Sequence, residues 1–502
     1  CGADGLRGAV GEPALAGKFT PAYIRRMNMS RVTRAVQFAA AVAPAPLAAQ
    51  RPTLSSSVRQ YVSVDAPAVA ITHVRVIDGT GATAKPDQTV IIADGKIAAV
   101  GPSASTQPPA GAQVIDGTGK SVIPGLIMVH EHLFYPSAPG VYGNFSESFT
   151  RLYLAGGVTS MRTGGNMNGF GEIAIARDIK AGTKPGPWID ATAPYLEGPG
   201  LPLGQVYALK DAADARRLVG YWADAGATSF KAYMHISRDE LKAAAEEAHK
   251  RGMKITGHLC SVTYREAIAA GIDDLEHGFM AATDFVKDKK ADECPGQGTG
   301  QASIAALSPD EPAFTSLVSE LVKAKTAVTS TLTVFESTVA GRPVPPGIDV
   351  LEPALLEQYQ TRKANAERAN NPAAMNLLKS DMKLEAAFFR AGGFLVAGTD
   401  PTGGGGVIAG YSNQRQVELL VEAGLSPLEA IKVCTLNGAT YLGIADRAGS
   451  IATGKQADLV LIAGDPSATI GDIRKVATVF KQGVGYDPQK LVNSVKGKVG
   501  IF

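Results

Sequence analysis

The feature that most constrains the fold is a long central stretch in which short apolar, β-like segments alternate with helical patterns. Eight β-like segments can be placed: Val122–His132, Val158–Thr163, Trp188–Ala193, Thr228–His235, Met253–Cys260, Asp273–Gly278, Ala327–Val334 and Phe394–Asp400. Between them lie helical patterns such as "SRDELKAAAEEAHKRG", in which Ser237 and Glu240 form a capping box. This alternation predicts a parallel sheet with crossover helices, arranged as a (β/α)8 barrel.

Both ends of the chain have a different texture, rich in β-branched residues and turns. "AVAITHVRVIDGTG" and "QTVIIADGKIAAVG" precede the central stretch, and "GSIATGKQADLVLIAGDP" follows it. These runs of Val and Ile, broken by Asp-Gly and Gly-Thr-Gly turns, predict a small β-sandwich domain. We expect residues 68–122 to form its first part, 123–445 the barrel, and 446–502 its second part with a C-terminal tail.

Residues 1–50 are predicted to be a leader outside the fold. Arg25, Arg26, Arg31 and Arg34 precede a mainly apolar run from Ala35 to Ala49 that ends in small residues. This order is typical of a secretory signal, and the run is too short to span a bilayer. A periplasmic or secreted protein is therefore expected, with a disordered leader on a cytoplasmic protein as the alternative.

Composition limits the classes of partner. The net charge of +2 gives no electrostatic case for nucleic acid or an anionic membrane. Four cysteines, at positions 1, 260, 294 and 434, show no CxxC spacing. They predict neither a disulfide framework nor a cysteine-based zinc site. We expect a small-molecule substrate, no membrane span, and association into a homo-oligomer through apolar flanks of the barrel.

Candidate metal ligands stand at the ends of the predicted strands. "GLIMVHEHLF" places His130 and His132 two residues apart, so both can face the barrel interior while Glu131 points the other way. At the carboxyl mouth of a barrel, two such imidazoles form half of a metal site. Alone, a His-x-His pair is more often a pair of exposed side chains.

Lys231 lies within an apolar strand in "GATSFKAYMHIS", with Tyr233 on the same face. A lysine that points into a barrel core is costly unless it is neutralised or paired. A buried amine with a lowered pKa can react with carbon dioxide to form a carbamate, an anionic ligand able to bridge two metals. The alternative is a lysine that extends its charged end to solvent at the strand end.

Three further strand ends carry side chains able to bind a metal. His258 ends the fifth strand in "KITGHLCS", His277 ends the sixth in "IDDLEHGF", and Asp400 ends the eighth in "GGFLVAGTDPTGGGG". Taken alone, a histidine in this position is more often structural than a ligand, and an aspartate at a strand end usually caps a loop or the next helix. Together with His130, His132 and Lys231, they predict six inward groups at the catalytic face of the barrel.

These motifs resemble those of the amidohydrolase superfamily, in particular its imidazolonepropionase-like and prolidase-like branch. The resemblance runs from Ala68 to the C-terminus and includes "VIDGTGKSVIPGLI", "GGVTSMRTGG", "EHG" and "AGTD". Its most specific part is "VELLVEAGLSPLEAIKVCTLNGATYLG" followed by "GSIATGKQADLVLI". The resemblance implies two divalent metals, usually zinc, bridged by carboxylated Lys231. It assigns His130, His132 and Asp400 to the more buried metal, and His258 and His277 to the other.

The implied activity is hydrolysis of an amide or peptide C–N bond by metal-activated hydroxide. N-acyl amino acids, dipeptides and aryl amides are the expected substrates. Asp400 would accept and pass on the proton, and Tyr233 would donate a hydrogen bond to the oxyanion, unless it is a packed rim tyrosine. Arg162, at the end of the second strand, would grip a substrate carboxylate or form a structural ion pair.

Two other functions stay open at this point. One is a cyclic-amide hydrolase or a deaminase, because relatives use closely similar ligands for those reactions. The other is a non-catalytic barrel, a class that typically loses ligands. The turn-rich stretch from Met280 to Pro312 fits no barrel element and is expected to form a loop over the catalytic face.

Overall fold

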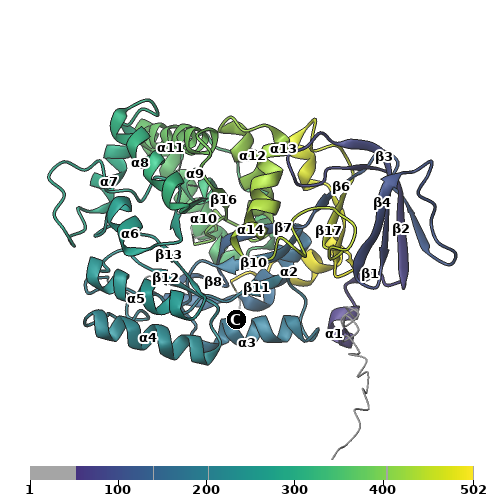
Figure 1. Cartoon of the computed structure of the whole chain (residues 1–502), viewed down its shortest axis with the longest axis horizontal. Coiled ribbons are helices and arrows are strands. Elements are labelled where there is room, and N and C mark those ends of the chain that lie inside the picture. The colour runs from purple at the N-terminus through teal and green to yellow at the C-terminus, as the bar shows by residue number, and fades with distance from the viewer. Residues whose placement is uncertain (1–52, 139–140, 202, 338, 403–404, 501–502) are drawn as a thin grey trace, which may run out of the picture. The chain divides into compact units, whose positions relative to one another are not determined.

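The computed structural model describes residues 53–500, apart from 139–140, 202, 338 and 403–404 (Figure 1). The predicted leader lies outside the described residues, so that prediction stands as it was. Within the described ranges, every helix is too short or too polar to cross a membrane.

Parallel strands occur at all eight predicted places in the centre of the chain. They are β7 (Leu126–Glu131), β10 (Val158–Thr163), β11 (Trp188–Asp190), β12 (Ser229–Ala232), β13 (Lys254–Gly257), β14 (Asp274–Glu276), β15 (Ala327–Ser330) and β16 (Leu395–Ala397). Their side chains are almost all buried, as expected for parallel strands that are covered on both faces.

Hydrogen bonds arrange these strands in sequence order as two sheets, β11-β10-β7 and β12-β13-β14-β15-β16. A parallel bridge between Thr192 and Ser229 joins the two sheets on one side. On the other side, the amides of Thr399 and Asp400 both donate to the carbonyl of His130. The strands therefore follow one another around a ring, and the centre is an α/β fold of the barrel type.

The first predicted strand, Val122–His132, is in fact two strands. β6 (Ser121–Pro124) pairs with the peripheral sheet, and β7 begins the barrel after Gly125. A Cβ atom at Gly125 would lie 2.1 Å from Thr159 Oγ1, so only glycine allows this close passage from one sheet to the other. The continuous apolar run concealed the change of sheet.

Helices cover the outside of the ring between successive strands. The main ones are α2 (Ser146–Ala155), α3 (Phe170–Lys180), α4 (Ala212–Ala225), α5 (Arg238–Lys250), α6 (Tyr264–Ala270), α8 (Pro312–Ala324), α11 (Pro372–Arg390) and α12 (Tyr411–Glu422). The predicted capping box of α5 is present, because Ser237 and Glu240 each accept from the other's backbone N–H. Shorter or peripheral helices are α1 (Ser56–Arg59), α7 (Gln297–Ala305), α9 (Leu332–Glu336), α10 (Pro353–Ala369), α13 (Pro427–Lys432), α14 (Gly438–Tyr441) and α15 (Pro488–Val495).

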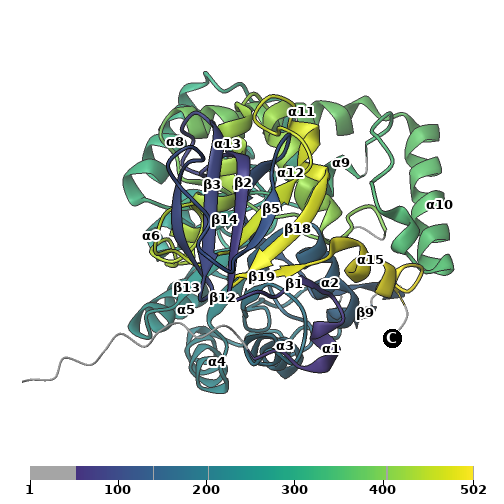
Figure 2. The same cartoon turned by 90° about the vertical axis from the view of Figure 1, so that its right-hand side faces the viewer.

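A nine-stranded sheet combines strands from both ends of the described chain. Its members are β1 (Val62–Val64), β2 (Ala68–Val76), β3 (Lys85–Ala93), β4 (Lys96–Pro102), β5 (Gln113–Asp116), β6, β17 (Leu459–Ile462), β18 (Val476–Lys481) and β19 (Val484–Tyr486). Figure 2 shows the purple N-terminal strands β2, β3 and β5 beside the yellow C-terminal strands β18 and β19. Hydrogen bonds give the order β1-β19-β18-β17-β6-β2-β3-β4, with β5 on β2. All nine strands belong to one hydrogen-bonded sheet, so the second layer of the expected β-sandwich is not confirmed. A separate hairpin, β8 (Phe134–Ala138) and β9 (Val141–Asn144), follows β7.

One buried carboxyl in the helical layer should make stability depend on pH. Burial raises the pKa of Glu172, in the first turn of α3, from 4.5 to about 8. Between these two values the folded chain holds a proton that the unfolded chain has released. The free energy of unfolding should therefore fall by about 1.4 kcal/mol per pH unit across this window because of this group, and its contribution should level off above pH 8.

Glu172→Gln keeps the shape of the side chain but cannot ionise. We expect its melting temperature to rise relative to that of the original protein as the pH increases from 5 to 8, and the difference to stay constant above pH 8. Thermal denaturation of both proteins at one-unit steps of pH measures this difference. A difference that does not change with pH would contradict the assignment.

Candidate metal centre

The structure brings the six predicted ligand side chains to one cavity at the carboxyl ends of the barrel strands. The cavity has a volume of about 220 Å³, and its walls include His130, His132, Lys231, His258, His277 and Asp400. His130 and Lys231 lie within β7 and β12, while His258 and His277 directly follow β13 and β14. Because parallel strands all end at the same mouth, residues far apart in the sequence meet there.

The side chains are close enough to share a bound ion. Asp400 Oδ1 lies 2.9 Å from His132 Nε2 and 3.6 Å from His130 Nε2, and Asp400 Oδ2 lies 3.9 Å from His277 Nδ1. Donor atoms of His130, His277 and Asp400 all lie within 4.8 Å of one another. Ligands held at about 2.1 Å around a tetrahedral ion are separated by roughly 3.5 Å, so this cluster fits a divalent metal.

Protonation states at the site also fit a metal. Burial lowers the pKa of all four histidines, that of His258 to about 3, so each imidazole is neutral near pH 7. Burial opposes ionisation of Asp400, but hydrogen bonds from His130 and His132 hold its pKa well below the ordinary value. Neutral imidazoles and an ionised carboxylate are the donors that zinc and similar divalent ions prefer.

Lys231 is 1% exposed and lies at the centre of the site. Its Nζ is 3.4 Å from His130 Nε2 and donates a hydrogen bond to Glu276. Burial lowers the pKa of Lys231 well below its usual value, which favours the neutral amine. The side chain does not extend to solvent, so of the two interpretations of the sequence the structure favours the inward lysine.

Glu276 is a functional residue that the sequence reasoning missed. Besides Lys231, its carboxylate accepts hydrogen bonds from Arg162 Nη1 at 3.0 Å and Thr256 Oγ1 at 2.6 Å, and lies 3.2 Å from His130 Nδ1. Carboxylates behind a metal-binding histidine commonly fix the orientation of the imidazole. The available signal was its position in "EHG", since an acidic residue inside a buried strand must be paired.

Arg162 does not reach the cavity, which corrects the expectation that it grips a substrate carboxylate. Its guanidinium donates to Glu276, to the hydroxyls of Ser229 and Thr256, and to the carbonyls of Val129 and Phe230. Every N–H of the guanidinium is thus occupied by buried partners, and no donor is left for a ligand. Its position matches the alternative prediction, a structural ion pair, which it forms with Glu276.

Glu131 lies on the opposite face of β7 from the two histidines, as strand alternation predicts. Its carboxylate accepts hydrogen bonds from Thr399 and from Asn413 on α12. Glu131 is completely buried in the wall of the barrel, and burial raises its pKa to about 8. It therefore anchors the outer helix to the strand that carries His130 and His132.

Tyr233 lines the cavity beside the proposed ligands. Its ring centroid lies 5.0 Å from that of His258 and 4.5 Å from that of Tyr195. Loss of hydration raises the pKa of Tyr233, so its hydroxyl keeps its proton and remains a hydrogen-bond donor. The position is compatible with the expected contact to a developing oxyanion.

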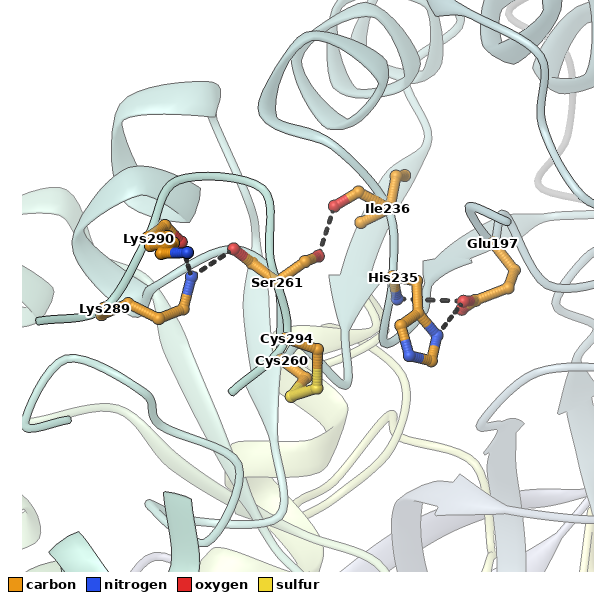
Figure 3. The surroundings of a disulfide bond; sticks show 8 residues. All are labelled: Glu197, His235, Ile236, Cys260, Ser261, Lys289, Lys290 and Cys294. Carbon is orange, nitrogen blue, oxygen red and sulfur yellow. Dashed lines mark hydrogen bonds and ion pairs between the residues drawn. A yellow bond between two sulfur atoms is a disulfide. The ribbon is translucent and has the colours of Figure 1, made fainter. Parts of the chain in front are cut away.

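A disulfide beside the cavity corrects the expectation that the cysteines form none. Cys260, two residues after His258, is bonded to Cys294 (Figure 3). Lys289 Nζ also donates to the carbonyl of Ser261 at 2.7 Å, close to the disulfide in Figure 3. The segment from Met280 to Pro312, expected to be a loop, contains helix α7. Met280, Thr283, Gly296, Gly300 and Gln301 from this segment line the cavity.

Removing the disulfide should destabilise the protein. The bond links residues 34 apart in the sequence, and a cross-link of this span contributes about 3–4 kcal/mol by restricting the unfolded chain. We expect Cys260→Ser to lower the melting temperature by on the order of 5 °C. Cys294→Ser and the double variant should melt at the same temperature as Cys260→Ser, because each change breaks the same bond. Melting of all three variants within a degree of the unaltered protein would contradict this.

Comparisons with known proteins found similar sequences and similar folds. A sequence model described as "Amidohydrolase family" matches residues 121–486. Adenine deaminase 3 of Rhizobium meliloti is 24% identical over 388 residues, which cover 75% of this chain and 51% of the deaminase. An imidazolonepropionase of Desulfotalea psychrophila is 40% identical over 62 residues, covering 12% of this chain and 15% of that protein. The matched regions thus span about half or less of these two relatives.

Solved structures are similar over more of their length. A protein from Bifidobacterium longum assigned as a prolidase superposes with a TM-score of 0.63 at 25% sequence identity. The superposition covers 86% of this chain and 99% of that protein. The similarity in fold therefore extends over most of this chain and almost all of that protein.

Proposed function

The chain belongs to the amidohydrolase family, and on that premise we propose that it is a metal-dependent hydrolase of an amide or peptide C–N bond in a small substrate. N-acyl amino acids, dipeptides and aryl amides form the proposed substrate range. The observation that carries the proposal is the meeting of four neutral imidazoles, one ionised carboxylate and one buried lysine in a single cavity. The assignment of the Bifidobacterium longum neighbour as a prolidase supports a C–N bond as the target.

Two zinc ions are the proposed cofactors. His130, His132 and Asp400 would hold the more buried ion, and His258 and His277 would hold the other. Lys231, as a neutral amine, would add to carbon dioxide and release a proton, and the resulting carbamate would bridge the two ions. Metals bound at this site would supply an acidified water and a polarised substrate carbonyl.

The protein's own groups then have distinct tasks. Asp400 is ionised, so its free oxygen can accept a proton from the attacking water and deliver it to the leaving nitrogen. Tyr233 keeps its proton, so it can donate a hydrogen bond to the oxygen that becomes negative in the transition state. Glu276 and Arg162 hold Lys231 and His130 from behind and touch no substrate.

A second candidate is opening of a cyclic amide or deamination of a ring. It is favoured by the names of the two sequence relatives, imidazolonepropionase and adenine deaminase. A non-catalytic role would not require the complete set of six ligand side chains that the cavity presents. Hydrolysis therefore stands first, and ring chemistry second.

The test combines metal analysis with substrate panels. We expect about two metals per chain in the purified protein, loss of hydrolysis when a chelator removes them, and recovery when zinc is added back. Panels of aryl amides, dipeptides and N-acyl amino acids should be assayed beside cyclic amides and purine bases. Turnover confined to the ring substrates would favour the second candidate. Full metal content without any turnover would contradict both.

We also propose that the protein works outside the cytosol. The Cys260–Cys294 disulfide supports this, because stable disulfides form mainly in oxidising compartments. Fractionation of cells that express the full chain should place it in the periplasm or the medium. Recovery in the cytosol, with both cysteines open to thiol reagents, would contradict the proposal.

A further inference from the structure

The cavity wall that faces the metal ligands is aromatic and rich in methionine. Its apolar and aromatic members are Phe134, Met167, Tyr195, Met234, Met280 and Phe335, and the polar residues Tyr142, Thr283, Gln301 and Thr402 also line the cavity. Several of these rings pack directly on the ligand cluster: the centroid of Phe134 lies 4.3 Å from that of His132, and the centroid of Phe335 lies 5.9 Å from that of His277. A substrate group held next to the scissile bond therefore meets carbon and sulfur atoms over most of its surface.

The described lining offers no positive side chain to a substrate carboxylate. Apart from the histidines and tyrosines, its ionisable groups are Lys231 and Asp400, both within the ligand cluster, and Lys231, whose pKa is lowered by burial, donates to Glu276. Arg162 lies behind the strands with every N–H occupied. A carboxylate pressed against this wall would lose its water and gain no cationic side chain from the lining, which is unfavourable.

The apolar lining continues past Met167 and Tyr195, which also line a second depression of about 380 Å³. Tyr221 and Trp222 contribute to its walls, with ring centroids 5.2 Å apart, and Tyr221 is 51% exposed. Its cation, Arg217, is held by Asp214, with Nε at 3.0 Å and Nη2 at 2.6 Å from the same carboxylate oxygen. The continuation is therefore aromatic, and its one positive charge is neutralised.

We propose that the substrate presents a neutral aromatic or apolar group to this wall, so that uncharged aryl amides are preferred to dipeptides and N-acyl amino acids that carry a free carboxylate. This inference rests on the proposed function and narrows its substrate class. Aromatic and thioether side chains contact flat, uncharged groups well, and a wall without a cationic side chain gives no counter-charge to a substrate carboxylate held beyond the metal ligands.

A matched pair of substrates tests the proposal. Para-methylacetanilide and para-acetamidobenzoate have the same scissile amide and differ in a methyl group against a carboxylate. With the zinc-loaded protein, we expect kcat/KM for the neutral compound to be at least tenfold higher, after each value is divided by the rate of hydroxide-catalysed hydrolysis of the same compound. Equal values, or preference for the carboxylate, would overturn the proposal.

Calorimetric binding of the same two compounds separates the proposal from the proposed function. If the neutral compound binds at least tenfold more tightly while neither compound is hydrolysed, the inference about the wall holds and the hydrolase assignment fails. If hydrolysis proceeds but the anion binds as well as the neutral compound, the hydrolase assignment holds and the inference fails.

A charge-introducing variant provides a second, independent test. Met167 lies between the two depressions, so Met167→Lys places a cation where a substrate carboxylate would lie, and Met167→Gln is a neutral control of similar length. We expect the ratio of kcat/KM for para-acetamidobenzoate to that for para-methylacetanilide to be at least tenfold higher in the lysine variant than in the glutamine variant. Equal ratios in the two variants would show that charge at this wall does not select the substrate.

Discussion

Lys231→Ala should lower hydrolysis by on the order of a thousandfold or more, and the metal content should fall with it. The lysine nitrogen lies 3.4 Å from His130 Nε2 in the middle of the ligand cluster, so its removal takes away the group proposed to bridge the two ions. The four histidines and Asp400 would remain, but without a central anionic ligand. Metal analysis and kcat/KM for the best substrate of the panel, measured on the same preparation, check both parts of the expectation.

A matched variant separates loss of the bridge from damage to the fold. Lys231→Ala also removes a hydrogen-bond donor from the buried Glu276 carboxylate, and this can destabilise the barrel. Lys231→Gln retains a hydrogen-bond donor toward Glu276 but cannot form a carbamate. We expect the glutamine variant to melt closer to the unaltered protein and yet to lose metal and activity as fully as the alanine variant. Two metals and undiminished hydrolysis in Lys231→Gln would exclude a carbamate bridge.

Carbon dioxide provides an additional check on the same residue. If the bridge is a carbamate, zinc added to metal-free protein in bicarbonate-free buffer should restore activity slowly or incompletely. Added bicarbonate should then accelerate recovery in the unaltered protein and have no effect on Lys231→Gln. Recovery that does not depend on bicarbonate would favour an unmodified lysine.

The barrel strands and the convergence of the ligands were predictable from the sequence, for a physical reason. Buried parallel strands require continuous apolar runs, and the side chain at the end of each run lies at the same mouth. His258 and His277 could thus be placed together although no local pattern links them. The division of Val122–His132 between two sheets was missed because the apolar run continues through Gly125.

The residues that the sequence did not reveal depend on contacts between distant segments. Cys260 and Cys294 are joined only because the segment after β14 returns over the end of β13, and a spacing of 34 residues carries no signal for that return. Glu276 and Arg162 belong to different strands, and their pairing depends on which face of each strand turns inward. Without knowledge of that pairing, the sequence allows Arg162 either to bind a substrate carboxylate or to form an ion pair with a buried carboxylate of the protein.

Glu276→Ala should be the most destabilising single change at the site. Its carboxylate is completely buried and contacts the Arg162 guanidinium, the Lys231 amine and the Thr256 hydroxyl. Removing one partner of a buried ion pair leaves an uncompensated charge and typically costs about 3–5 kcal/mol. We expect a loss of this size in the free energy of unfolding of the metal-free protein, measured by chemical denaturation.

Glu276→Gln is the matched control, because it keeps the size of the side chain and an oxygen that can accept from Arg162 or Thr256. It should be less destabilising than Glu276→Ala, although it too leaves Arg162 without a counter-charge. A double variant locates the source of the loss. If part of the loss in Glu276→Ala comes from the Lys231 amine that is left without a partner, the double variant should lose about 1–3 kcal/mol less stability than the sum of the losses of the two single variants. Additive losses would mean that the two side chains do not stabilise each other, and that Glu276 acts through Arg162 and Thr256 alone.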